Sequence, residues 1–283
     1  MNIVVCIKQV PDTSEVRIDP KTNNLVREGI PSIMNPYDKN ALEEALKIKD
    51  SLNCKLTVVS MGPPQAVDIL QEALDMGADR AILLSDKAIV GSDTLATGYV
   101  LSELIKSLNP FLVLCGAEAI DGSTGQVGPS IAENLGFPHI TYVNEILRCS
   151  KSEIEVSREV KEVYEHLKCS LPALICVLRG INEPRICKKN KKKPEIINIK
   201  MLSLDKNRLG IDGSPTRVEK IDMSSRRSMS FVTVDSLLPA DERIELIVNG
   251  GIKPKKVDLI RGTPADMAKY ILKDETFADY IGN

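Results

Sequence analysis

The residues best suited to chemistry in this sequence form a small, glycine-rich segment near its middle. Residues 117–129 read Ala-Glu-Ala-Ile-Asp-Gly-Ser-Thr-Gly-Gln-Val-Gly-Pro, and a helical pattern begins at Ser123. Glycines let backbone N–H groups approach an anion, hydroxyl groups add donors, and a helix N-terminus supplies positive potential. The segment matches neither a Walker A loop nor G-x-G-x-x-G. Two interpretations remain, a phosphate cradle and a structural turn.

A second segment of this kind, Gly91-Ser92-Asp93-Thr94, stands at the start of another helical pattern. Ser92 has the type of an N-cap residue and Asp93 that of a first-turn acid, so the spacing alone also fits an ordinary helix start. In an open parallel sheet, ligands bind beyond the carboxyl ends of the strands, where both segments would lie. Two neighbouring phosphate sites suggest two nucleotides or one dinucleotide.

Basic residues are a third candidate feature. Residues 188–193 hold five lysines in six positions, which is typical of a solvated loop, with a nucleic-acid contact as the alternative. The net charge is −2 and aromatic residues make up 4% of the chain, which argues against a general nucleic-acid binder. Lys8 and Arg158 could each neutralise a phosphate or pair with a carboxylate.

The sequence gives little support for a metal site, for catalysis by histidine or cysteine, or for a membrane span. Neither His139 nor His166 has a second ligand at metal-binding spacing, so we expect no metal site and no histidine-driven catalysis. The seven cysteines form no C-x-x-C pair, which favours buried, reduced thiols. The apolar runs are too short to span a bilayer and no secretory signal is recognisable, so we expect a cytoplasmic protein without membrane insertion.

Alternating strand and helix patterns would position these segments. Strands are predicted at 3–7, 55–60, 80–85, 111–116 and 139–143, and helices at 37–49, 65–76, 92–107 and 123–135. This alternation predicts a doubly wound α/β fold, with a mainly parallel sheet and helices on both faces.

The pattern changes from residue 146 onward. Ile146–Cys149 and Ile154–Val160 predict an antiparallel excursion near 146–178, and Leu167–Val177 predicts a strand in which Pro172 marks an edge or a bulge. We divide the chain into a nucleotide-binding domain, 1–195, and a C-terminal arm, 196–283. Within the arm, only 234–237 and 264–272 have helical patterns, so it either wraps another chain or docks on its own domain.

A series of motifs, in order along residues 1–215, resembles the beta subunit of electron transfer flavoproteins. The motifs are Val5-Cys6-Ile7-Lys8-Gln9-Val10-Pro11-Asp12, Met34-Asn35-Pro36-Tyr37-Asp38, Val59-Ser60-Met61-Gly62-Pro63, Leu74-Asp75-Met76-Gly77-Ala78-Asp79-Arg80, Ala119–Pro129 and Ile181-Asn182-Glu183-Pro184-Arg185. The resemblance implies a heterodimer with an alpha subunit whose mobile domain carries the main FAD. The beta subunit carries a second nucleotide, AMP in simple carriers and FAD in electron-bifurcating members. The implied contacts here are Cys6, Lys8, Asn35, Pro36, Tyr37, Asp38, Met61, Asp121, Gly122, Ser123, Thr124, Gly125, Gln126, Val127, Gly128 and Pro129.

The resemblance is closer to the bifurcating type, because the loop before Gln126 is shorter and richer in glycine than in AMP-binding members. In that type, Gly91, Ser92, Asp93 and Thr94 would hold the NADH pyrophosphate. NADH would give a hydride to the FAD of this subunit. One electron would pass to ferredoxin or flavodoxin, and the other through the alpha-subunit FAD to a partner dehydrogenase; the reverse flow is equally compatible. The alternatives are an AMP-bearing carrier that serves acyl-CoA dehydrogenases and a non-redox nucleotide-binding module.

Two motifs depart from the family. The Asp-Gly-Gly turn usual after Arg-Glu-Val is absent at 158–163, and the segment after Glu183-Pro184-Arg185 is short and lacks the protruding Leu that acyl-CoA dehydrogenases recognise. We therefore expect a different dehydrogenase partner, with a 2-hydroxy acid such as lactate as a candidate substrate. Residues after 215 match the family poorly, and we expect them to hold the alpha subunit or the dehydrogenase.

Overall fold

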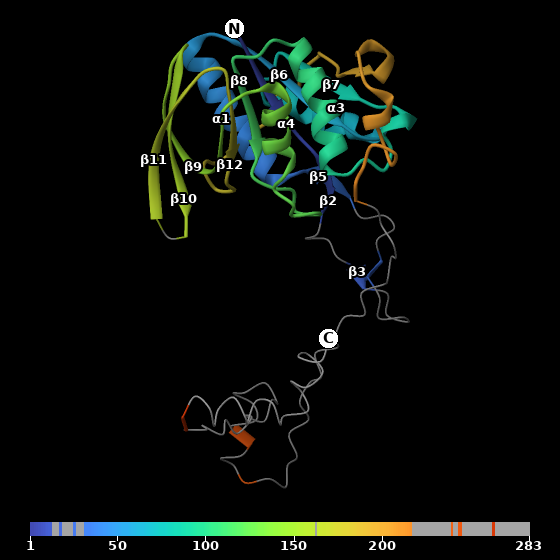
Figure 1. The fold of residues 1–283 in the computed structure, drawn as a ribbon. Coiled ribbons are helices and arrows are strands. Elements are labelled where there is room, and N and C mark those ends of the chain that lie inside the picture. Colours follow the sequence, from blue (N-terminus) through green and yellow to red (C-terminus); the bar gives the residue numbers. More distant parts are fainter. Residues whose placement is uncertain are drawn as a thin grey trace. The chain divides into compact units, whose positions relative to one another are not determined.

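A computed structural model describes residues 1–12, 17–18, 25–26, 31–161, 163–216, 239, 243–244 and 262–263 of the 283-residue chain. The chain divides into two compact units, Met1–Met223 and Ser224–Asn283. The sheets and the packed helices lie in the first unit (Figure 1). The helical stretches expected at 234–237 and 264–272 lie outside the described residues.

A nine-stranded sheet forms the centre of the first unit, in the order β11-β10-β9-β12-β8-β1-β6-β7-β13. Its strands are β1 (Asn2–Cys6), β6 (Lys55–Met61), β7 (Arg80–Leu84), β8 (Leu112–Gly116), β9 (His139–Cys149), β10 (Glu153–Val160), β11 (Val163–Ser170), β12 (Ala173–Val177) and β13 (Glu195–Ile197). Two small antiparallel pairs accompany it, β2 (Gln9–Pro11) with β5 (Ser32–Met34) and β3 (Arg17–Ile18) with β4 (Leu25–Val26). In the series β9-β12-β8-β1-β6-β7-β13, each strand is parallel to its neighbours. This arrangement confirms the predicted α/β class.

Helices cover both faces of the sheet, as a doubly wound fold requires. Helices α1 (Pro36–Leu52) and α2 (Val67–Met76) share one buried cluster with Ile3 and Val5, while α3 (Thr94–Ser107) and α4 (Val127–Leu135) share the other with Val4 and Cys6. Successive residues of β1 therefore point into opposite cores, which explains why the strand is apolar throughout. Short 3-10 helices connect these elements at Pro64–Ala66, Lys87–Ile89, Ile199–Met201 and Lys206–Arg208.

The direction of winding reverses at β1. From β1 the chain proceeds to β6 and β7 on one side, then crosses over to β8 on the other side of β1. Such a reversal leaves a crevice beyond the carboxyl ends of the two strands, because the connections leave in opposite directions. The fold therefore predicts a ligand site after Cys6 and Gly116.

The antiparallel excursion is present, but one of its predicted strands was wrong. Leu167–Val177 is not a single strand: β11 ends at Ser170 and β12 begins at Ala173. Pro172 falls between them, so neither strand loses a ladder hydrogen bond, and β12 lies inside the sheet between β9 and β8. Between β10 and β11, Lys161 has a φ of +50°, a conformation that glycine adopts more readily.

Two predicted helix starts were too early. The helix expected from Ser123 begins at Val127, because Ser123 and Gly125 have φ values of +48° and +61°, which interrupt a right-handed helix. The helix expected from Ser92 begins at Thr94, and its N-cap is Asp93, not Ser92. Of the two alternatives for the tail, docking on its own domain describes residues 195–204, where β13 pairs with β7 and Leu202 and Leu204 pack near α3.

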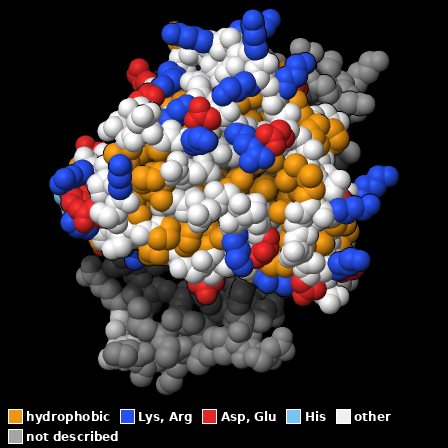
Figure 2. All heavy atoms as spheres, turned by 90° about the horizontal axis from the view of Figure 1, so that it is seen from above, with side chains coloured by type: hydrophobic (Ala, Val, Ile, Leu, Met, Phe, Trp, Pro, Cys, Tyr) orange, Lys and Arg blue, Asp and Glu red, His pale blue; other side chains and the backbone are white. Residues whose placement is uncertain are grey.

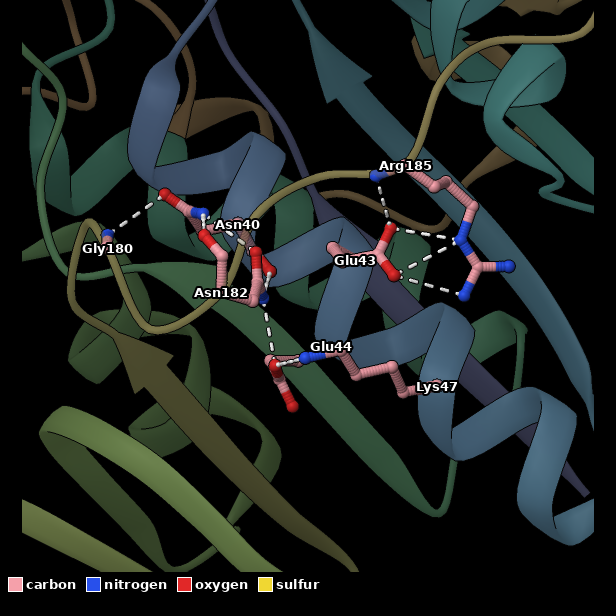
Figure 3. A network of polar contacts seen from close by, with 7 residues as sticks. All are labelled: Asn40, Glu43, Glu44, Lys47, Gly180, Asn182 and Arg185. Carbon is pink, nitrogen blue, oxygen red and sulfur yellow. Dashed lines mark hydrogen bonds and ion pairs between the residues drawn. The ribbon is translucent and has the colours of Figure 1, made fainter.

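A polar network fastens the chain after β12 to α1 (Figure 3). Asn40 Nδ2 donates to the backbone oxygen and Oδ1 of Asn182, both at 2.8 Å, and Asn182 Nδ2 donates to the Asn40 carbonyl at 2.9 Å and to Glu44 Oε1 at 2.9 Å. The Gly180 N–H donates to Asn40 Oδ1, and Lys47 forms an ion pair with Glu44 at 2.7 Å. The buried polar side chains of α1 are thereby satisfied.

Arg185 closes the same network at its other end. Its backbone N–H, Nε and Nη2 donate to the Glu43 carboxylate at 3.0–3.1 Å, and Nη1 lies 3.1 Å from Asp50. The Glu43 side chain is 6% exposed, whereas that of Asp50 is 61% exposed. Figure 2 shows one face of the molecule, where lysine and arginine side chains alternate with acidic and hydrophobic ones. An exposed ion pair is screened by water and salt, so the buried Glu43 is a stronger partner for Arg185 than the exposed Asp50.

We expect Glu43→Gln to lower the free energy of unfolding by about 1–3 kcal/mol, because it leaves the guanidinium of Arg185 without its buried charge partner. Asp50→Asn is the matched control and should cost about 0.5 kcal/mol or less, as exposed pairs do. Urea unfolding followed by circular dichroism measures both. Equal effects of the two substitutions would contradict this ranking.

Candidate functional site

A cavity of about 950 Å³ opens at the carboxyl ends of the central strands. This volume is near the upper end of the range for ligand and cofactor sites. Its walls come from the loops after β1, β6, β7 and β8 together with the first turns of α3 and α4. The lining residues are Cys6, Ile7, Lys8, Asn35, Asp38, Met61, Gly62, Pro63, Pro64, Ser85, Asp86, Lys87, Ile89, Val90, Gly91, Ser92, Asp93, Thr94, Thr97, Leu101, Cys115, Gly116, Ala117, Glu118, Ala119, Gly122, Ser123, Thr124, Gly125, Gln126, Val127 and Gly128.

The structure brings most of the candidate residues to this cavity. Sixteen of the twenty named from the sequence line it; the exceptions are Pro36, Tyr37, Asp121 and Pro129. Tyr37 and Asp121 instead hold neighbouring groups: Tyr37 Oη donates to Glu118 at 3.1 Å, and Asp121 pairs with Lys8 at 2.7 Å.

Sequence reasoning missed four lining residues inside the α-helices and strands, namely Thr97 and Leu101 of α3 and Cys115 and Gly116 of β8. Thr94, Thr97 and Leu101 follow one another at i, i+3 and i+7, which places them on one helix face. That spacing was the available signal once the start of α3 was taken as part of the site.

Asp38 connects the two strand ends beneath the cavity. Its Oδ2 accepts the Lys8 N–H at 2.8 Å and its Oδ1 accepts the Gly116 N–H at 3.1 Å. A Cβ atom on Gly116 would lie 2.4 Å from Asp38 Oδ1, so glycine is required there for this approach. Asp38 is 8% exposed, and burial raises the pKa of its carboxyl to about 7 although both backbone hydrogen bonds oppose the shift.

Asn35 extends this connection to the glycine-rich loop. Its backbone N–H donates to the Lys8 carbonyl at 2.9 Å. Its side-chain Nδ2 donates to the Glu118 carbonyl at 2.9 Å, and its Oδ1 accepts the Ile120 N–H at 3.3 Å. The buried Asn35 therefore fixes residues 118–120 relative to the end of β1.

The glycine-rich loop leads directly into α4. The amides of Val127 and Gly128 belong to the first turn, where a helix leaves N–H groups without intrahelical acceptors. A Cβ atom on Gly128 would lie 2.5 Å from Cys176 Sγ, so α4 rests on β12 at this point and its N-terminus is held at the cavity. This geometry suits an anion, as the sequence indicated for one of its two interpretations.

The first turns of α3 and α4 lie side by side. Thr94 Oγ1 donates to Gln126 Oε1 at 3.0 Å, which joins the first residue of α3 to the N-cap of α4. Both helices therefore direct the positive ends of their dipoles toward one cavity. The prediction that the two segments would be neighbours is confirmed by this contact.

The cysteines are less uniformly buried than expected. Cys6, Cys115 and Cys176 are buried on neighbouring strands, Cys54, Cys149 and Cys169 are partly exposed, and Cys187 is exposed. Hydrogen bonds from Cys176 and Cys6 hold the pKa of Cys115 well below its usual value. All seven thiols are free.

Other chemistry has no evident centre in the part of the chain that the structure describes. No group of three or more histidine, cysteine or acidic side chains there is placed to hold a metal ion. Neither histidine lines the cavity. Across the described ranges, no helix has both the length and the apolarity to cross a membrane.

Comparison with known proteins identifies the family of the chain. The family model described as the electron transfer flavoprotein domain matches residues 22–201. The chain belongs to the electron transfer flavoprotein family, and its curated relatives place it among the beta subunits.

Several relatives match over most of their length. The electron transfer flavoprotein subunit beta of Thermoanaerobacterium thermosaccharolyticum is 45% identical over 92% of this chain and 96% of its own. The CarD subunit of the caffeyl-CoA reductase-Etf complex of Acetobacterium woodii is 46% identical over 77% of this chain and 86% of its own. Protein FixA of Azotobacter vinelandii is 41% identical over 83% and 89%.

Titration of Asp38 should make stability depend on pH. The folded protein holds this proton up to about pH 7, whereas the unfolded chain loses it near 3.8, so the stabilisation is complete at low pH and is lost as the pH rises through 7. We expect the difference in unfolding free energy between wild type and Asp38→Asn to shrink from pH 5 to pH 8. Urea unfolding at each pH measures it, and a pH-independent difference would show that Asp38 does not titrate in this range.

A methyl group on Gly128 should displace α4 from β12. We expect Gly128→Ala to cost about 1–3 kcal/mol of stability through overpacking against Cys176, and the added Cys176→Ala substitution to restore most of it. Gly122→Ala is the control, since nothing lies within 4 Å of the added atom. Thermal unfolding compares the variants; a Gly128→Ala loss that Cys176→Ala leaves unchanged would disprove the contact.

Proposed function

We propose that this chain is the beta subunit of a heterodimeric, electron-bifurcating electron transfer flavoprotein, with FAD and NADH sharing the cavity. The observation that carries the proposal is the opening of two helix N-termini, those of α3 and α4, into one cavity at the reversal point of the sheet. Each N-terminus suits one phosphate group. A mononucleotide such as AMP needs only one of them, which favours the dinucleotides over the simple carrier.

The residues along the loop after β8 fit the FAD pyrophosphate. The first-turn amides of Val127 and Gly128 supply donors, and Ser123 and Thr124 add hydroxyl groups beside them. Lys8 supplies a cation, although it is paired with Asp121 at 2.7 Å and would have to share that partner. A bound FAD would supply hydride acceptance and one-electron transfer, and this chain would hold and orient it.

The remaining candidate contacts would enclose the rest of the cofactor. Cys6, Asn35, Asp38 and Met61 line the cavity near the ends of β1 and β6. Four candidates do not line the cavity and would act indirectly, by shaping the loops that contact the cofactor: Pro36, Tyr37, Asp121 and Pro129. Asp38 in its neutral form would spare an anionic ligand the repulsion of a buried carboxylate.

NADH would take the second helix start. Gly91, Ser92, Asp93 and Thr94 line the cavity at the beginning of α3, and Lys87 lies on the same wall. Asp93 Oδ1 accepts the N–H groups of Leu95 and Ala96, both at 3.0 Å, so its charge is used within the helix cap. The Asp93 N–H donates to Ser214 Oγ and the Ser92 N–H to the Ile89 carbonyl. The Gly91 and Thr94 N–H groups and the Lys87 ammonium would therefore be the donors for the pyrophosphate.

The partners follow from the family and from one surface feature. We propose an alpha subunit with the main FAD, a ferredoxin or flavodoxin as low-potential acceptor, and a flavin-dependent dehydrogenase, with residues 196–283 contacting these partners and 1–195 holding the nucleotides. The short segment after Arg185 motivates a 2-hydroxy acid such as lactate as substrate. Ile186 is 89% exposed there, and CarD belongs to a caffeyl-CoA reductase complex, which together favour a CoA thioester as the second candidate.

Nucleotide content tests the proposal. The co-expressed alpha–beta complex should release two FAD per heterodimer on acid treatment and no AMP, as measured by chromatography. The Glu43→Gln complex serves as a control, because that substitution lies outside the cavity and should leave the content unchanged. One FAD with one AMP would overturn the bifurcating assignment and leave a simple electron carrier, in which Gly91–Thr94 is only a helix cap.

A further inference from the structure

A segment near the end of the first unit crosses the outer surface of α3 and reaches the cavity loop. This segment, residues 205–216, is called the C-terminal strap. At its beginning the Asp205 N–H donates to Tyr99 Oη at 2.8 Å, and the Arg208 guanidinium lies 3.7 Å from the centroid of the Tyr99 ring. Arg208 Nη2 also donates to Asn134 Oδ1 at 3.0 Å. These contacts fix the strap to α3 and α4.

Farther along, the strap fits closely against the loop that precedes α3. Leu209 is buried in the core shared with α3. A Cβ atom on Gly210 would lie 2.5 Å from the Ala88 carbonyl, and one on Gly91 would lie 2.5 Å from Ile211 Cγ1. Both glycines have positive φ values, +56° and +76°, so this close approach has a matching backbone conformation on each side.

The strap ends on Asp93, the N-cap of α3. Thr216 donates its backbone N–H at 3.1 Å and its hydroxyl at 2.8 Å to Asp93 Oδ2. The Asp93 N–H donates to Ser214 Oγ at 2.8 Å, and the hydroxyl of the buried Ser214 donates in turn to the Gly210 carbonyl at 2.6 Å. Burial acts to raise the pKa of Asp93, but these hydrogen bonds together with those from Leu95 and Ala96 hold it below its usual value.

Asp93 therefore divides its two oxygens between two tasks. Oδ1 caps α3, and Oδ2 is taken by the strap. Without Thr216 the carboxylate would lose its second pair of donors, so it could rotate, weaken its cap on Leu95 and Ala96, and present its charge to the cavity wall of which it is part. A mobile negative charge there opposes the binding of a phosphate.

We propose that Ser214 and Thr216 are positioning residues for the NADH subsite, because they hold the N-cap carboxylate and amide of α3 in place. The inference rests on the proposed function, since it needs NADH to bind at the start of α3.

The test compares Thr216→Val with Thr216→Ser in the full alpha–beta complex. The valine removes the hydroxyl donor at nearly constant volume, and the serine keeps it. We expect Thr216→Val to raise the Kd of NADH about three- to tenfold, the size of one ordinary hydrogen bond, because the N–H of residue 216 still donates to Asp93. Thr216→Ser should bind as wild type. The FAD content should be unchanged in both. Hydrogen exchange of the Leu95 and Ala96 amides should be faster in Thr216→Val.

The outcomes separate the inference from the function on which it rests. If Thr216→Val has wild-type NADH affinity and wild-type amide exchange, the positioning role of Thr216 is overturned, while the proposed NADH site is not affected. Loss of FAD together with NADH would show a general structural role and also overturn it. A wild-type complex that binds no NADH would overturn the proposed function itself. The positioning role of Ser214 and Thr216 would fall with it, whatever the hydrogen-exchange rates of the amides. Arg208→Gln, which loosens the strap away from Asp93, should change NADH affinity less than Thr216→Val does.

Discussion

The buried carboxyl group of Asp38 is the constraint on which the site depends. It joins the loop after β1 to the last residue of β8 through the amides of Lys8 and Gly116. The winding of the sheet reverses between these two strands. A buried carboxylate is costly unless its oxygens are satisfied, and here two backbone amides do so. The side chain comes from the first turn of α1, so helix and both strand ends form one unit. The crevice has a defined shape because these three elements cannot move independently.

The cavity then takes its electrostatic character from what surrounds this joint. The N-termini of α3 and α4 contribute positive potential, and Lys8 and Lys87 add charge at the walls. Acidic groups in the same place are kept from opposing an anion in different ways. Asp38 has a pKa of about 7, Asp121 is paired with Lys8, and Asp93 is occupied by backbone amides and the strap. A phosphorylated ligand therefore meets Asp93 and Asp121 already engaged, and an Asp38 carboxyl that is partly protonated near pH 7.

Much of this could be read from the sequence, and the exceptions have physical causes. The apolar runs and the helix periodicity define a doubly wound sheet, since strand and helix periods differ and the connections must be right-handed. The start of α4 was placed too early because Ser123 and Thr124 have the types of cap residues, whereas the backbone of Ser123 and Gly125 is left-handed. Pro172 was read as lying inside a strand because the apolar run continues across it. The C-terminal strap was not predicted. It is held by single hydrogen bonds and by close backbone contacts at glycines, between residues about 120 positions apart in the sequence. Such contacts leave no periodic pattern in the sequence.

The most direct test of the account is an anaerobic titration of the assembled alpha–beta complex with NADH, followed by the flavin absorbance band. NADH should bleach this band without any added dehydrogenase, because hydride acceptance would occur on a flavin held by this chain beside the start of α3. Thr216→Val should shift the titration to higher NADH without changing its end point. An absorbance band that NADH leaves unchanged would contradict the shared dinucleotide site, and the cavity would then hold a nucleotide without a redox role.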